Sequence, residues 1–202
     1  MPFELVPKHK ATIVAIEILS LKMGQVDVQP AVCITLKVPL PNSKLAMLSP
    51  TLREFLYENS TNRPATQQQL EGVEVVSDKP NLTAAASAIG AIHWEYEQTG
   101  CKLCIYNGVS GHEDITLTDA TVRKLKLEPR EGGTVDHVFQ VYTAAVDAEV
   151  IGELGVLKSL ERDIELTLPE PLQQSLPDKG NGSKETPESA LAKSVKGETE
   201  KA

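Results

Sequence analysis

Alternation of apolar and polar residues dominates the chain up to residue 170. In the segment AVCITLKVPL, residues 31–40, Val32, Ile34 and Leu36 fall on one face, and Cys33 and Thr35 on the other. A period of two over this length predicts a half-buried strand. The apolar stretch ATIVAIEILSL, residues 11–21, precedes it across the turn-prone KMGQVD, so the two segments are expected to form a hairpin.

The second half of the chain repeats this alternation. CKLCIY and EDITLT flank the turn NGVSGH, and TVRKLKL and TVDHVFQVY flank EPREGG, whose Gly132 and Gly133 suit positive φ. DIELTLP, residues 163–169, and GVEVVS, residues 72–77, read as further strands. The segment of residues 83–97 is open between a small-residue helix and a loop that enters a strand at His93.

Two short helices are predicted. LSPTLREFLYE, residues 48–58, has Ser49 as a candidate N-cap and Pro50 at the first helical position. Residues 147–160 form an amphipathic pattern with Val150, Leu154 and Leu157 on one side. The fold class that follows is mainly β, a β-rich α+β domain of antiparallel hairpins in a sandwich or open barrel with one or two short helices.

Composition divides the chain into residues 1–170, one globular domain, and residues 171–202. The second part is rich in Pro, Gly, Ser, Lys and Glu and has few large apolar residues, so a disordered tail is expected. No apolar run approaches the roughly 20 residues that span a bilayer, and MPFELVPKHK lacks the apolar stretch of a signal peptide. With three cysteines and no expected disulfides, a cytoplasmic, non-membrane protein is predicted.

The net charge and the small number of aromatic residues both argue against nucleic-acid binding. The net charge is −8, and the residues before Glu170 hold 22 acidic and 15 basic side chains. A surface of that sign repels phosphate unless its bases gather on one face. The chain has only eight Phe, Tyr and Trp residues to stack on bases.

The segment TGCKLCIYNG, residues 99–108, has the C-x-x-C spacing of zinc and redox sites. In a strand, however, residues i and i+3 point to opposite faces, so Cys101 and Cys104 should diverge. We expect two strand residues here, with an unusual metal site that includes His112 as the alternative. The loop GVSGHED adds Glu113 and Asp114 but lacks the fixed elements of a hydrolase or metalloprotease, so no enzyme activity, metal or cofactor is predicted.

The densest basic stretch is RKLKLEPR, with Arg123, Lys124, Lys126 and Arg130. Alternation with two leucines projects Lys124 and Lys126 from one side of a strand, where they could follow a phosphate backbone. Tyr106 and Tyr142 are the candidate stacking groups. The alternative is an edge strand that lysine protects against aggregation.

The segments LSPTLREFLYE, KLKLEPREGGTVDHVFQV and IGELGVLKSLERDIELTLPEP resemble a family of uncharacterised proteins from tailed bacteriophages and prophages. The likeness covers residues 1–170 and centres on an EP-x-x-GGTV turn. It implies a phage gene product in the cytoplasm of a bacterial host, beside early replication and recombination genes, and it brings no catalytic residues.

Two hypotheses follow. The first is a non-enzymatic accessory of phage DNA replication or recombination that binds single-stranded DNA through Arg123, Lys124, Lys126, Arg130, Tyr106 and Tyr142. The second is a β-module that binds a host or phage protein or assembles with itself, as a host-factor blocker or particle component. A homo-oligomer is compatible with both.

Overall fold

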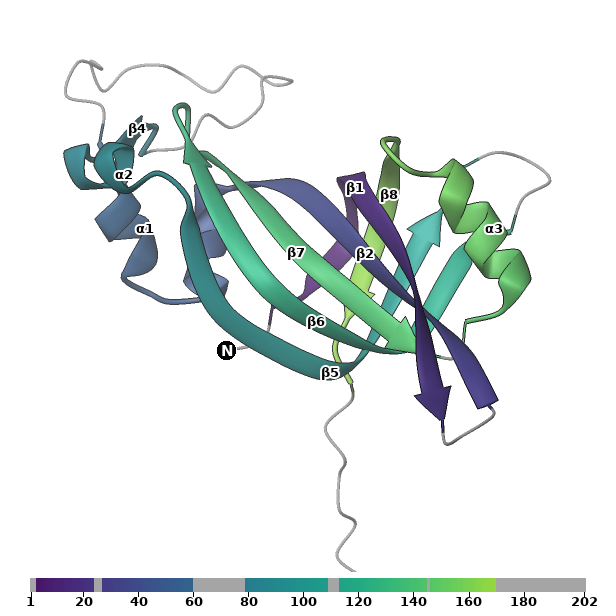
Figure 1. Ribbon diagram of the computed structural model, residues 1–202. Helices are drawn as coiled ribbons and strands as arrows, with labels where there is room; N and C mark the ends of the chain where they lie inside the picture. The colour runs from purple at the N-terminus through teal and green to yellow at the C-terminus, as the bar shows by residue number, and fades with distance from the viewer. Residues whose placement is uncertain (1–2, 24–26, 60–78, 109–112, 145, 170–202) are drawn as a thin grey trace, which may run out of the picture. The chain divides into compact units, whose positions relative to one another are not determined.

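Six long antiparallel strands form the frame of the protein. The computed structural model describes residues 3–23, 27–59, 79–108, 113–144 and 146–169. The strands are β1 (Leu5–Met23), β2 (Asp27–Pro41), β5 (Ile92–Tyr106), β6 (Ile115–Arg130), β7 (Thr134–Ala144) and β8 (Glu161–Thr167). They pair in the order β1-β2-β7-β6-β5-β8, and β8 also pairs with β1 (Figure 1). The predicted β-rich class with antiparallel hairpins is confirmed, and the sheet closes into a barrel.

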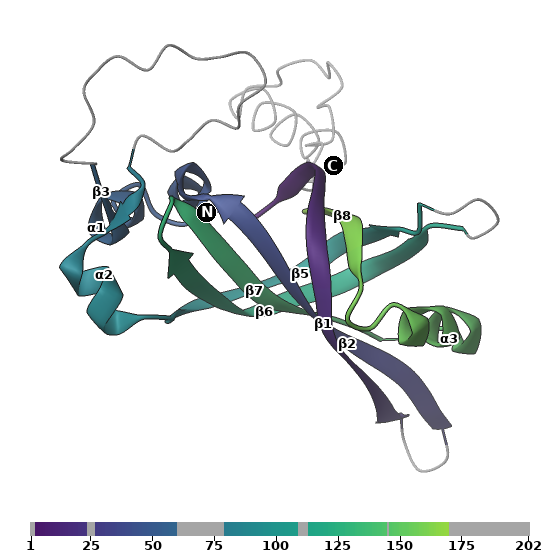
Figure 2. The same ribbon diagram turned by 90° about the horizontal axis from the view of Figure 1, so that it is seen from above.

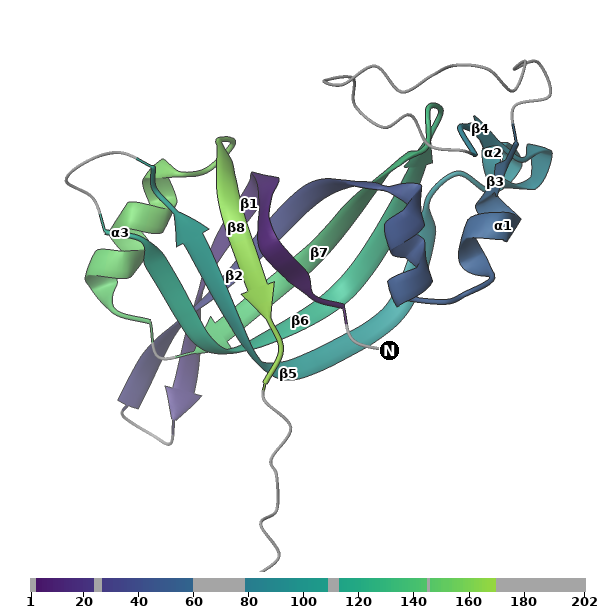
Figure 3. The same ribbon diagram turned by 180° about the vertical axis from the view of Figure 1, so that it is seen from behind.

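Short elements gather at the two ends of this barrel. At one end lie the 3-10 helix η1 (Asn42–Met47), α1 (Leu52–Leu56), β3 (Tyr57–Glu58), β4 (Asn81–Leu82) and α2 (Ala84–Ile89), and α3 (Ala148–Val156) lies at the other (Figure 3). α1 starts two residues after the expected Pro50, and its N-cap is Thr51 in place of the expected Ser49. Ser49 Oγ lies 3.3 Å from Thr51 Oγ1. In α2, the Ala86 N–H donates to Thr83 Oγ1 at 3.1 Å, and Gly90 ends the helix at φ 71° before β5.

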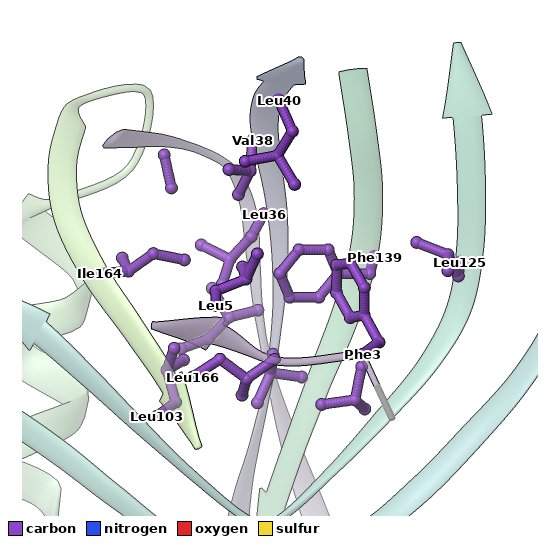
Figure 4. Close-up of a cluster of buried hydrophobic side chains, with 14 of the residues drawn as sticks. Phe3, Leu5, Leu36, Val38, Leu40, Leu103, Leu125, Phe139, Ile164 and Leu166 are labelled. Carbon is purple, nitrogen blue, oxygen red and sulfur yellow. The ribbon is translucent and has the colours of Figure 1, made fainter. Parts of the chain in front are cut away.

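The barrel interior is filled by the apolar face of every strand (Figure 4). The alternating residues of β2 from Val32 to Leu40 are at most 1% exposed, as the period of two predicts. From the N-terminal segment, Phe3 enters the core and packs edge-on against Phe139, with ring centroids 5.2 Å apart. Its ring also stacks on His137 at 5.8 Å, so the first described residue of the chain belongs to the core.

β6 departs from the sequence-based expectation in two ways. EDITLT and TVRKLKL, which were expected to belong to separate strands, are halves of one strand, bent where Asp119 and Lys124 have φ of 51° and 53°. The prediction of an exposed edge strand is wrong, because β5 pairs with one side of β6 and β7 with the other. The lysines of this strand therefore lie on the outer face of the barrel, not along an open edge.

Two further sequence predictions fall on parts of the chain that the structure does not describe: the strand at residues 72–77 and the tail at 171–202. Among the residues that it does describe, no helix has the length and apolar character needed to cross a bilayer.

Candidate functional site

A groove of about 800 Å³ lies beside the first residues of β5 and the middle of β6 and β7. We call it the basic groove, because β6 contributes Arg123, Lys124 and Lys126 to its lining. β7 adds Val138 and Gln140. The sequence-based site prediction thus has three of its basic residues together in one hollow of the surface.

A β-bulge in β6 sets how the three basic side chains are presented. Arg123 lies opposite Gln140 of β7 and Lys126 lies opposite Val138, so one residue of β7 faces two residues of β6. Lys124 occupies the bulge with φ 53°, a left-handed conformation that costs a non-glycine residue about 1 kcal/mol or more. Its side chain is exposed. Without the bulge, strict alternation would send Lys124 and Arg123 to opposite faces.

The cross-strand pair Arg123 and Gln140 carries unused hydrogen-bonding capacity. Arg123 Nε and Gln140 Oε1 are buried from water, and neither has a hydrogen-bond partner within the part of the chain that is described. The Arg123 guanidinium lies over the Tyr142 ring, 5.1 Å from its centroid, and its Nη2 is 4.0 Å from Cys33 Sγ. Buried polar atoms normally find a partner, so this donor and this acceptor, on residues paired across β6 and β7, are available for a further hydrogen bond.

β5 forms the opposite wall and brings acidic and aromatic residues. His93, Glu95 and Glu97 are exposed on its outer side. Tyr96 belongs to the inner side, because its hydroxyl oxygen accepts a hydrogen bond from the Phe3 N–H at 3.0 Å. Burial raises the pKa of Tyr96. Trp94 also lines the groove, but it packs against the core. His93 is therefore the exposed ring of this wall.

Arg130, the fourth predicted basic residue, belongs to an ion-pair network near the β6–β7 turn. It pairs with Asp136, whose side chain is only 2% exposed and also lies 2.7 Å from Lys37 Nζ. Lys126 Nζ is 2.7 Å from Glu128 Oε1, and this hydrogen bond lowers the pKa of the Glu128 carboxyl. The network therefore neutralises Arg130 and partly neutralises Lys126.

The two predicted stacking residues have different surroundings. Tyr142 lies on the outer face beside the groove, covered by Arg123. Tyr106 lies nine positions from Glu97, the β5 partner of Arg123, which is roughly 30 Å along the strand. Its hydroxyl donates to Glu165 at 2.7 Å, which raises its pKa to about 12, and Lys8 Nζ lies 3.3 Å from the ring centroid. Tyr106 is thus separate from the basic groove.

The cysteine pair diverges as the strand geometry predicts. Cys101 is fully buried, its pKa is raised by burial, and its thiol donates to the Gln98 carbonyl at 3.6 Å. Cys104 is half-buried and lies 3.6 Å from Thr116 Oγ1. No group of three His, Cys, Asp or Glu side chains suited to a metal ion occurs in the described ranges, and His112 lies beyond them.

Sequence reasoning missed Gln140 and His93 as groove residues. Gln140 is the polar outward residue between Phe139 and Val141, and hairpin pairing from the EPREGG turn would have placed it opposite Lys124. The bulge moves it to Arg123. His93 could not be assigned to the outer face from the sequence, because that face is defined only once the strand that begins at Ile92 is known.

Comparison with protein-family models, with curated proteins and with solved structures finds no match for the chain. The class of the protein therefore rests on its own fold and site: a six-stranded antiparallel barrel with a basic groove on its outer face.

Proposed function

We propose that the chain is a non-enzymatic binding protein that holds single-stranded nucleic acid in the basic groove. The observation that carries this proposal is the Arg123–Gln140 pair, an open donor and an open acceptor in a groove that Lys124 and Lys126 also line. On a chain with a net charge of −8, a lining with three cationic and two acidic side chains is locally positive, which favours an anionic ligand.

The two walls divide the contacts with the ligand. Lys124 and Lys126 on the β6 wall meet phosphates, and Glu95 and Glu97 on the β5 wall keep the backbone away from that side. The bases then turn toward Arg123 and Gln140, whose side chains rotate on binding so that the buried Nε–H and Oε1 meet an acceptor and a donor on a base edge. The Arg123 guanidinium plane and the His93 ring offer surfaces for stacking.

Single-stranded ligand is favoured over duplex because base pairing in a duplex occupies the Watson–Crick edges, which an unpaired base leaves open to protein groups. The resemblance to phage and prophage proteins gives the biological setting of the proposal, an accessory of phage DNA replication or recombination in the bacterial cytoplasm. The self-assembling alternative concerns a different surface, the outer edge of β1 from Ala15 to Leu21, which no strand covers within the described ranges.

The test is fluorescence anisotropy of labelled single-stranded and duplex oligonucleotides titrated with the full chain across a salt series. Single strands should bind more tightly than duplex, and affinity should fall steeply with salt as counterions are released. Lys124→Asp should lower affinity at low salt by about tenfold, since it reverses one charge of the groove. Asp tolerates the left-handed backbone at this position, so the variant keeps its fold.

The matched control is Lys102→Glu, the same change of charge at an exposed position of β5 away from the groove. It should retain nearly wild-type affinity. Absence of binding at low salt overturns the proposal, and so does an equal loss in Lys102→Glu and Lys124→Asp, because binding would then follow net charge alone.

A further inference from the structure

The second half of β1 has a free edge. β1 pairs with β8 only from Leu5 to Thr12, and the last backbone bonds on this side join Ile13 to Ser159 and Leu160. From Ala15 to Leu21, β1 pairs with β2 on its other side, and within the described ranges no strand covers the outer edge. Figures 1 and 2 show this part of the β1–β2 hairpin projecting beyond the barrel.

Large apolar side chains are exposed along this edge. Ile18 is 60% exposed, the bulged Val14 is 44% and Leu19 is 36%, and Leu160 beside Ile13 is 38%. These residues are half of the exposed large hydrophobic residues in the described part of the chain, so exposed apolar surface is concentrated near this edge, on both faces of the ribbon. A two-stranded ribbon with such residues is only marginally stable in water and gains from a further strand.

We propose that the β1 edge pairs antiparallel with the β1 edge of a second copy of this chain. A two-fold axis makes any such edge complementary to itself, since each copy offers the same row of backbone donors and acceptors. The result is a four-stranded sheet in the order β2-β1-β1-β2 that joins two barrels.

Side chains select the register of this pairing. With the axis at Ile18, the two Ile18 side chains meet, Ile16 faces Ser20, and Ala15 faces Leu21 on the other face of the sheet. Glu17 then faces Leu19, and Lys22 faces the bulged Val14. No like charges are opposed in this register, and the most exposed apolar side chain of the edge is buried at the axis.

The experiment measures the mass of the full chain by light scattering and sedimentation from micromolar to millimolar concentration. The wild-type protein should pass from monomer to dimer. Ile18→Lys and Ile18→Glu should each remain monomeric, because the register places like charges face to face at the axis. An equimolar mixture of these two variants should restore the dimer, since lysine then faces glutamate.

Ile89→Lys on α2 is the matched control, because it places the same charge at a residue 54% exposed on a different element, and it should dimerise like the wild type. Circular dichroism verifies that the variants fold. A wild-type chain that stays monomeric throughout overturns the proposal, and so does an Ile18→Lys variant that still dimerises. Neither result depends on nucleic-acid binding, which is measured separately on the groove variants.

Discussion

The two faces of the β6–β7 hairpin differ in what fixes their side chains. On the inner face, Leu125, His137 and Phe139 are at most 1% exposed and are held by packing inside the barrel. On the outer face, the side chains near the turn are held by ion pairs, and those farther along lie in the basic groove with hydrogen-bonding groups unused. Alternation and the bulge in β6 therefore divide these two strands into a packed inner face and a polar outer face.

This difference implies that substitutions on the inner face change mainly the free energy of unfolding, although Leu125 and Phe139 also touch the groove. Substitutions of the exposed groove residue Lys124 should change affinity at constant stability. Asp136 lies between these extremes, since it is an outer residue that is buried under its cationic partners. Three substitutions, taken in order of decreasing effect, test this separation.

The largest effect is expected at His137, the titratable group of the inner face. Burial lowers its pKa from 6.5 to about 4, Nδ1 lies 3.1 Å from the Val135 carbonyl oxygen, and Nε2 has no partner among the described residues. Below pH 6.5 the imidazole of His137 is protonated in the unfolded chain but stays neutral in the folded chain. The free energy of unfolding therefore falls as the pH drops toward 4. The loss from this group reaches about 3 kcal/mol.

Urea unfolding at a series of pH values, on the wild type and His137→Gln, measures this loss. The variant should lose stability less steeply between pH 6.5 and 4, because it lacks the titrating ring. Thr143→Ala serves as control: it alters a buried polar residue of the same face that does not titrate, and should keep the wild-type slope. If the free energy of unfolding falls with pH equally in the wild type and in His137→Gln, the titration of His137 does not cause the loss of stability in acid.

Asp136→Asn should have the second largest effect. The substitution removes a charge that is 2% exposed and leaves Lys37 and Arg130 without their shared counterion. The expected loss of unfolding free energy is about 2 kcal/mol, below that of a fully buried pair because both cations can turn toward water. Glu128→Gln, whose carboxylate is 32% exposed, should cost less than about 1 kcal/mol.

Chemical denaturation gives both values, and oligonucleotide titration of the same proteins completes the comparison. Affinity should not fall in Asp136→Asn, since a negative charge near the groove is removed. If the variant has wild-type stability and weakened binding, Asp136 belongs to the ligand site. The ion-paired residues near the β6–β7 turn would then not be separate from the groove.

The barrel strands were predictable because alternation in β2 and around the β6–β7 turn is strict enough to assign inner and outer residues. The closure of the sheet was not, since it depends on β8 pairing with both β1 and β5 across more than fifty intervening residues. The unity of β6 was also hidden, because Asp119 and Lys124 interrupt the alternation with left-handed residues that carry no glycine signal.

The candidate site shows the same limit. The stretch RKLKLEPR identified the basic strand, but only the ion pairs of Arg130 and Lys126 distinguish its neutralised residues from Arg123 and Lys124. Tyr106 was predicted to join the basic residues only because its ring can stack on bases. In the structure, it lies nine positions along β5 from Glu97, the partner of Arg123. Gln140 was not found because a one-residue bulge decides which basic residue it faces.

The smallest effect is expected in the salt dependence of binding, and it distinguishes two lysines of one strand. Lys124→Asn removes a charge that has no ion pair within the described residues, and Asn accepts the left-handed backbone there. The slope of log affinity against log salt should become shallower by about 0.7, the value for one lost contact with a single strand. Lys126→Gln should change the slope by less, since Glu128 at 2.7 Å already neutralises Lys126.

Both variants should unfold within about 0.5 kcal/mol of the wild type, because surface substitutions rarely cost more. Equal slopes for the two variants would show that the ion pair opens on binding, so that the whole basic face of β6 meets the ligand.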